Sequence, residues 1–135
     1  MQTGTPVPRY FAFLRAINVG GRNVTMEVLR GHFETLGAGD VETFIASGNV
    51  IFSFRAGSAG ALEAKIEKHL LKSLGYEVST FVRTDKELAA IVRHTPFTPS
   101  QIAAAMALNV GFLSAPLETQ ATSALMALKT GIDDF

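Results

Sequence analysis

The sequence contains no cysteine, and this absence removes several kinds of chemistry at once. Without a thiol the protein has no disulfide bond, no thiolate zinc site and no cysteine nucleophile, so a metal would depend on histidine, aspartate and glutamate alone. These residues are scattered along the sequence, and we predict no metal site. Because proteins without disulfides suit a reducing environment, we expect a cytoplasmic location.

Net charge is absent as well, since 12 basic residues balance 12 acidic ones. No overall field therefore attracts the chain to nucleic acid or to an anionic membrane, and such a role would need a local cluster of charge. The N-terminal MQTGTPVPR lacks the basic start and long apolar run of a signal peptide, and Arg15 interrupts the apolar run that follows. We predict neither a signal peptide nor a membrane span.

Motifs of well-known catalytic sites are missing too. Neither GxGxxG nor GxxxxGK(S/T) occurs, and none of the three histidines, His32, His69 and His94, belongs to an HExxH pair. Ser47 has no neighbouring base in the sequence that would activate it as a nucleophile. The sequence thus assigns no catalytic residue and no cofactor, and it leaves enzymatic activity open.

The chain does contain enough apolar material for one core, with 47% hydrophobic residues in a length of 135. Helical spacing follows the capping residue Thr25 and would end at Gly37, and Ser58 and Gly75 bracket a second helix. Strand-like runs occur at residues 9–17, 41–46, 50–54 and 77–83. The order strand, helix, strand, strand, helix, strand predicts an α+β protein whose residues 9–84 form a ferredoxin-like βαββαβ sandwich.

Residues 85–135 predict a second, partial α+β unit. The sequence TDKE at 84–87 is a capping box that opens a helix, and Pro96 must end that helix. LNVGFL at 108–113 is typical of a fifth strand, and Pro116 opens a last helix. A single strand lacks the partners for a sheet of its own, so we expect this unit to be incomplete and the chain to be truncated at its C-terminus.

Two short polar segments are the main candidates for a functional site. A right-handed crossover makes the first two strands parallel, so RAINVGGRN after the first strand and SGN between the second and third should emerge at the same end of the sheet. The first helix also begins there, with its positive end. We therefore expect a ligand-binding rim that consists of Arg15, Asn18, Gly20, Gly21, Arg22, Asn23, Ser47, Gly48 and Asn49.

The residue types at this rim indicate the chemistry of the ligand. Arginine side chains, backbone donors freed by glycine and a helix N-terminus are the usual components of phosphate and carboxylate sites. Residues 1–26 contain three arginines and no acidic residue. We therefore predict binding of a small anionic ligand, which includes nucleotides. In the plainer interpretation the two segments are turns whose asparagines bond their own backbone, and the protein is a non-catalytic structural or interaction domain.

A further alternative is a sheet that binds single-stranded RNA. RNA-recognition motifs share the predicted strand order and present stacking aromatic residues on their first and third strands. The residues in question here are Phe11, Phe13, Phe52 and Phe54. The absence of net charge and the SGN before the third strand, where such motifs carry a basic residue followed by glycine, make nucleic acid the weaker alternative.

The segments YFAFLRAINVGGRN, MEVLR and VETFIASGNVIFSF together resemble the signature of the bacterial family catalogued as domain of unknown function 1697. Its members typically share LRGINVGG and SGN, with glycine where this chain has Ala16, and the later NVGFLSAP and the helix after it are also similar. The resemblance therefore runs from about Arg9 to the end of the chain. It implies a ferredoxin-related α+β fold and a chain that normally continues with further strands and an Arg- and Asn-bearing segment. It implies no substrate.

Overall fold

The structure is a computed structural model that describes residues 7–17, 21, 23–44, 48–55 and 57–135. The first six elements are β1 (Arg9–Leu14), α1 (Met26–Thr35), β2 (Gly39–Phe44), β3 (Asn49–Ser53), α2 (Ala59–Leu74) and β4 (Thr80–Thr84). Three helices follow, and these are α3 (Asp85–Arg93), α4 (Pro99–Ala104) and α5 (Thr119–Met126). No described helix is both long enough and apolar enough to cross a membrane.

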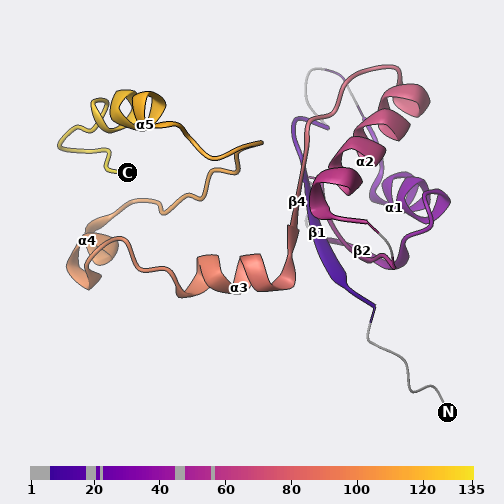
Figure 1. The fold of residues 1–135 in the computed structure, drawn as a ribbon, viewed down its shortest axis with the longest axis horizontal. Helices are drawn as coiled ribbons and strands as arrows, with labels where there is room; N and C mark the ends of the chain where they lie inside the picture. The colour runs from indigo at the N-terminus through magenta and orange to yellow at the C-terminus, as the bar shows by residue number, and fades with distance from the viewer. Residues whose placement is uncertain (1–6, 18–20, 22, 45–47, 56) are drawn as a thin grey trace, which may run out of the picture.

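The four strands form one antiparallel sheet in the order β2-β3-β1-β4 (Figure 1). β1 lies at the centre, where Ala12 faces Val50 on β3 and Val82 on β4. This order and the two intervening helices are those of a ferredoxin-like βαββαβ unit, which confirms the predicted α+β fold class. The strands are shorter than predicted at one end, because β1 ends at Leu14 and β4 begins only at Thr80.

The two helices of this unit begin and end where their capping residues predict. The Thr25 hydroxyl accepts a hydrogen bond from the Val28 N–H at the start of α1, and the Ser58 hydroxyl accepts one from the Ala61 N–H at the start of α2. At the end of α2 Gly75 has φ +82°, a left-handed conformation in which glycine commonly ends helices. Local sequence therefore determines both helices, and the sheet determines where they pack.

The hydrophobic core lies between the sheet and these two helices. Strands contribute alternate residues to it, among them Ala12, Leu14 and Phe52, because successive side chains of a strand point to opposite faces. Phe33 of α1 packs against Phe52 with ring centroids 5.2 Å apart, and Ile66 of α2 is also fully buried. Each helix presents one apolar face to this layer and leaves its polar face in solvent.

The same alternation contradicts the aromatic platform expected for RNA binding. Phe52 is only 1% exposed and lies on the helix side of the sheet, where Phe54 also lies against Lys65 of α2. Phe11 and Phe13 point to the opposite face, because they alternate with the buried residues of β1. The four rings therefore do not share a surface on which bases could stack.

Residues after β4 differ from the predicted second unit. The capping box opens α3 as expected, but residues 108–113 form no strand, α5 begins three residues after Pro116, and α4 was not predicted. A strand needs a neighbour with free backbone groups, and the N–H groups of Thr80 and Val82 on the adjacent edge strand are already donated to Glu67 and Glu63. The fifth strand therefore has no edge to join at β4.

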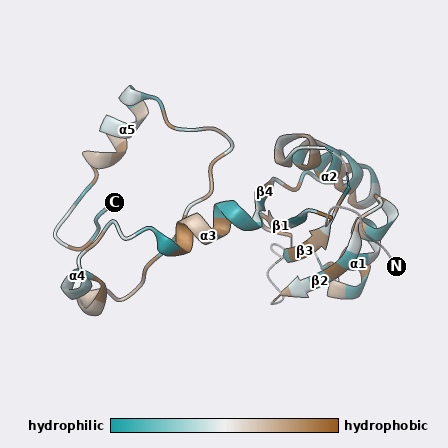
Figure 2. Cartoon of the chain, turned by 60° about the horizontal axis from the view of Figure 1, so that its bottom comes forward, coloured by the Kyte–Doolittle hydropathy of each residue, from teal (hydrophilic) through white to brown (hydrophobic). Residues whose placement is uncertain are grey.

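No described residue beyond Val82 is buried. Figure 2 shows α3 starting beside β4 and β1 and leading away from them, and α4 and α5 lying apart from the sheet and its two helices, with hydrophobic and hydrophilic residues mixed along all three. Large apolar side chains in this part are well exposed, including Val92, Met106, Leu128 and Ile132. All of the described core thus belongs to residues 9–84.

Candidate functional site

The loop after β1 and the β2–β3 hairpin meet at one end of the sheet, as the topology predicts. The Leu14 N–H donates a hydrogen bond to the Gly48 carbonyl oxygen at 3.0 Å. The Arg15 N–H donates one to the Ser79 carbonyl oxygen at 2.9 Å, so the start of β4 belongs to the same end of the sheet. We call this end the rim, and its described residues are 15–17, 21, 23–25, 48–49 and 76–79. The connection from α2 to β4 runs along this end of the sheet (Figure 1).

Gly48 holds the two segments at close range. Its φ is +88°, and a Cβ atom at this position would lie 2.9 Å from Ile17 Cγ2 and 3.1 Å from the Leu14 carbonyl oxygen. A larger residue would therefore suffer both backbone strain and a steric clash. Glycine is required here because two chain segments touch, and not merely because the hairpin turns.

The turn after β1 is anchored from the interior. Ile17 is 1% exposed, and its carbonyl oxygen accepts a hydrogen bond of 3.3 Å from the Tyr76 hydroxyl. Ala16 just before it has φ +54°, an unusual value for a residue other than glycine. Sequence reasoning missed Tyr76 and Ser79, although a ferredoxin-like order implies antiparallel pairing of β1 with β4, which places the start of β4 at this rim.

The predicted site residues divide into described and undescribed ones. Gly21 and Asn23 are exposed, Gly48 is buried, and the Asn49 side chain donates a hydrogen bond of 3.1 Å to the Phe44 carbonyl oxygen across the hairpin. Arg15 is exposed and takes part in no ion pair within the described part of the chain. Asn18, Gly20, Arg22 and Ser47 lie outside the described residues. The structure therefore brings the two predicted segments together, while the role of their side chains in binding stays a prediction.

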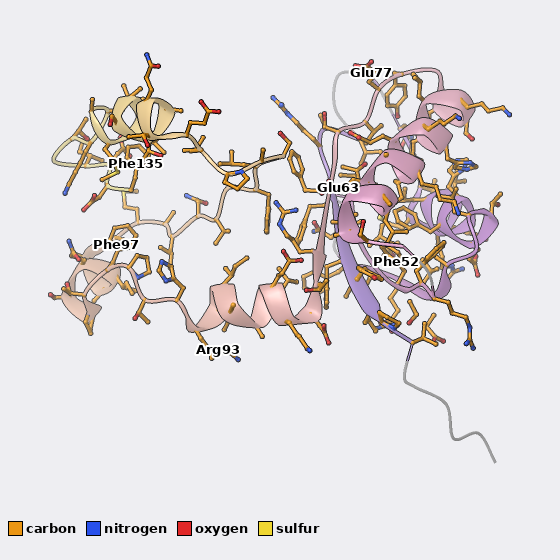
Figure 3. The ribbon with its side chains drawn as sticks, viewed as in Figure 1. Phe52, Glu63, Glu77, Arg93, Phe97 and Phe135 are labelled. Carbon is orange, nitrogen blue, oxygen red and sulfur yellow. The ribbon has the colours of Figure 1, made fainter. Side chains whose placement is uncertain are left out.

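Charges of both signs surround the rim. The positive end of α1 faces it, although Glu27 lies in the first turn of that helix. The negative end of α2 lies at the same edge, and the exposed Glu77 follows on the connection to β4 (Figure 3). An anion is consequently favoured on the side of Arg15 and α1 and disfavoured near the end of α2.

A cleft of about 570 Å³ lies beside the β4 edge, and α3 and residues 110–116 form part of its lining. Phe112 from this segment stacks on Phe13 of β1 at a centroid distance of 4.3 Å. The charged groups of the cleft are already engaged, since Glu63 accepts hydrogen bonds from Val82 and Arg83, and Glu87 accepts one from the Thr84 N–H. Because these groups neutralise one another or cap backbone donors, the cleft is a poorer candidate for a charged ligand than the rim.

Fold and rim together define the class of protein: a ferredoxin-like α+β unit in which two signature loops converge at one end of the sheet. The sequence matches, over residues 7–135, the family described as Protein of unknown function (DUF1697). The chain belongs to this family, which confirms the resemblance seen in the sequence.

A solved structure gives a second comparison. The conserved bacterial protein SP0830 from Streptococcus pneumoniae is 30% identical in sequence and superposes with a TM-score of 0.60. The match covers 67% of this chain and 50% of that one, so the match spans about half the length of the solved relative. No curated protein matches the sequence.

Proposed function

We propose that the rim binds a small anionic ligand that carries a phosphate or carboxylate group, a class that includes nucleotides, and that the protein acts in the cytoplasm. The observation that carries this proposal is the contact between the two signature loops, made by the Leu14–Gly48 hydrogen bond and by the close approach of Gly48 to Ile17. Two glycine-bearing loops and a helix N-terminus at one place supply backbone donors for an anion.

Each part of the rim has a distinct role in this proposal. Arg15 supplies a guanidinium group that no described carboxylate neutralises, and Arg22 supplies a second one. A guanidinium group can donate two parallel hydrogen bonds to a phosphate or carboxylate. Gly20 and Gly21 let the backbone approach the ligand, while the buried Gly48 lets the hairpin approach the end of β1. The polar side chains of Asn18, Asn23, Ser47 and Asn49 orient the ligand. The proposal concerns binding, and no residue is assigned a catalytic role.

A thermal-shift panel of inorganic phosphate, nucleotides and small carboxylates tests the proposal. A ligand present at about 100 times its Kd stabilises the native state by about 2.7 kcal/mol, which raises the unfolding midpoint measurably. We expect Arg15→Ala to abolish the shift, because it removes the unpaired guanidinium at the rim. Arg93→Ala is the matched control, since Arg93 is exposed on α3 away from the sheet (Figure 3).

The outcomes separate binding at the rim from other effects. A shift that Arg15→Ala removes and Arg93→Ala preserves supports the proposal, and Arg22→Ala should then weaken it as well. An equal loss in both variants indicates nonspecific attraction of anions to positive charge. If no ligand in the panel changes the midpoint of the unmodified protein, the rim has only the structural role of joining two loops.

A second candidate function is that of an interaction domain, which the exposed apolar side chains of residues 85–135 favour. Exposed apolar surface of this kind commonly marks a contact with another polypeptide. A second copy of the chain is the first partner to test, by sedimentation velocity over a hundredfold range of concentration. Met106→Ser and Ile132→Ser should weaken any association, because both side chains are more than 90% exposed. A monomer at every concentration would argue against self-association.

A further inference from the structure

The outer surface of the helix layer carries a pair of histidines that the rim does not use. His32 lies in the last turn of α1 and His69 in the second half of α2. The Nδ1 atom of His32 is 3.1 Å from the Nε2 atom of His69, and the ring centroids are 5.1 Å apart at an interplanar angle of 67°. Residues 37 positions apart in the sequence thus bring two imidazole nitrogens within contact distance.

We propose that His32 and His69 form a two-histidine site for a borderline divalent transition-metal ion, such as Zn²⁺, Ni²⁺ or Cu²⁺, which links α1 to α2. Imidazole nitrogen is a preferred ligand of these ions and binds zinc at about 2.0–2.1 Å. Two nitrogens on one ion at an angle of about 100° are therefore about 3.1 Å apart. The observed separation has this value, so an ion could contact both nitrogens with little movement of the helices. Without metal this contact is a hydrogen bond between the two rings, and metal binding would require the donor ring to carry its proton on its other nitrogen.

The surrounding packing holds both rings in place. Next to His32 in the chain is Phe33, and next to His69 is Leu70, and both of these residues are fully buried against the sheet. The backbone of each histidine is therefore anchored to the core, which reduces the conformational entropy lost when a metal binds. Burial, and then the neighbouring His69, lower the pKa of His32 below its ordinary value, which favours the uncharged ring that a metal requires.

The rest of the coordination sphere would be water. Within the described part of the chain, no group of three histidine, aspartate or glutamate side chains could hold a metal ion together. Ser73 Oγ lies 3.4 Å from the same His69 Nε2 atom in a hydrogen bond, which a bound ion would displace. A site with two nitrogen ligands and no carboxylate should select ions that favour imidazole and ignore Mg²⁺, which favours oxygen.

Thermal unfolding at pH 7.5 with the metal ions alone tests this proposal, on protein that carries no histidine tag and has been freed of metal by dialysis against a chelator. We expect a saturating concentration of Zn²⁺ to raise the unfolding midpoint by about 5 °C and Mg²⁺ to leave it unchanged. His32→Gln and His69→Gln should each abolish the zinc shift, since glutamine keeps a hydrogen-bonding group and removes the imidazole. His94→Gln is the control, because this exposed residue lies after α3, in the part of the chain that stands apart from α1 and α2 (Figure 1).

A spectroscopic measurement keeps the proposal falsifiable if a variant folds poorly. The electron paramagnetic resonance spectrum of one equivalent of Cu²⁺ bound to the unmodified protein should show coupling to two equatorial nitrogens. Coupling to one nitrogen only would overturn the proposal. So would a zinc shift of equal size in His32→Gln, His69→Gln and the unmodified protein, because the ion would then bind elsewhere.

Discussion

At the scale of single residues, Gly48 explains how the rim is built. Gly21, Gly57 and Gly75 also have left-handed backbone angles, but an added Cβ atom at any of these three would meet no atom within 4 Å. Gly48 instead combines φ +88° with neighbours at 2.9 Å and 3.1 Å from the position of a Cβ atom. The hairpin can approach the end of β1 only because no side chain stands between them. One glycine thus couples the geometry of two loops that are distant in the sequence.

Gly48→Ala should therefore destabilise the protein by about 3 kcal/mol, the sum of backbone strain and overpacking. Gly75→Ala is the matched control, because Gly75 has a similar φ of +82° and no atom within 4 Å of an added Cβ. We expect this control to lose only about 1 kcal/mol. Chemical denaturation measures both values, and equal losses would mean that the contact with Ile17 contributes nothing.

At the scale of secondary-structure elements, α2 protects the edge of the sheet that β4 would otherwise expose. Alternate residues of an edge strand direct their N–H groups away from the sheet. On β4 these N–H groups belong to Thr80, Val82 and Thr84, and all three are donated to carboxylates, two of which are on α2 and one on α3. The two carboxylates on α2, Glu67 and Glu63, are four residues apart and so lie on one face of the helix. The charged face of α2 thus has a structural task in addition to solvation.

Glu63→Ala should destabilise the protein by about 1–3 kcal/mol, because the Val82 N–H and the Arg83 guanidinium lose their acceptor. Glu63→Gln should recover most of this loss, since its amide oxygen can still accept from Val82. Lys68→Ala, an exposed change on the same helix, should alter stability by no more than about 0.5 kcal/mol. If chemical denaturation showed no larger loss of stability for Glu63→Ala than for Lys68→Ala, the proposed role of the carboxylate would be contradicted.

The double variant Glu63→Ala, Glu67→Ala should in addition promote self-association. Two neighbouring N–H groups of β4 would then be free to pair with a strand of another molecule. We expect sedimentation velocity to show concentration-dependent oligomers for this variant that the single variants lack. Unchanged monomer would show that α2 or residues 110–116 shield the edge sterically.

At the scale of the whole molecule, stability is concentrated in one part of the chain. All of the described core residues lie between Tyr10 and Val82. The segment from Asp85 onwards contacts this part where α3 adjoins β4 and β1, where Phe112 stacks on Phe13, and where Arg83 donates a hydrogen bond to the Leu113 carbonyl oxygen. We infer that residues 9–84 form a domain and that residues 85–135 form a separate, partial unit.

Limited proteolysis tests this division of the chain. Because none of residues 95–135 is buried, we expect early cleavage there and a protected fragment that ends between residues 84 and 95. A chain of residues 7–84 should unfold cooperatively with a midpoint close to that of the full chain. Early cleavage within α2 or β4, or a non-cooperative transition, would contradict the division, and mass spectrometry identifies the cleavage sites.

Much of this fold could be predicted because its signals are local. Thr25, Ser58 and Gly75 mark helix boundaries through their own backbone preferences, and the alternation of strands and helices leads to one topology. The meeting of the β1 loop with the hairpin followed from that topology. By contrast, the predicted strand at 108–113 failed because a strand depends on a partner, and nothing in LNVGFL shows whether one is present.

The sequence by itself thus determined the helix ends, the order of the elements and the family, since each of these depends on residues that are near one another in the chain. Only the tertiary structure decided which face of the sheet each phenylalanine occupies, that carboxylates of α2 close the β4 edge, and that His32 meets His69. These features depend on strand register and helix rotation, which are set by the packing of the whole core and leave no local trace in the sequence.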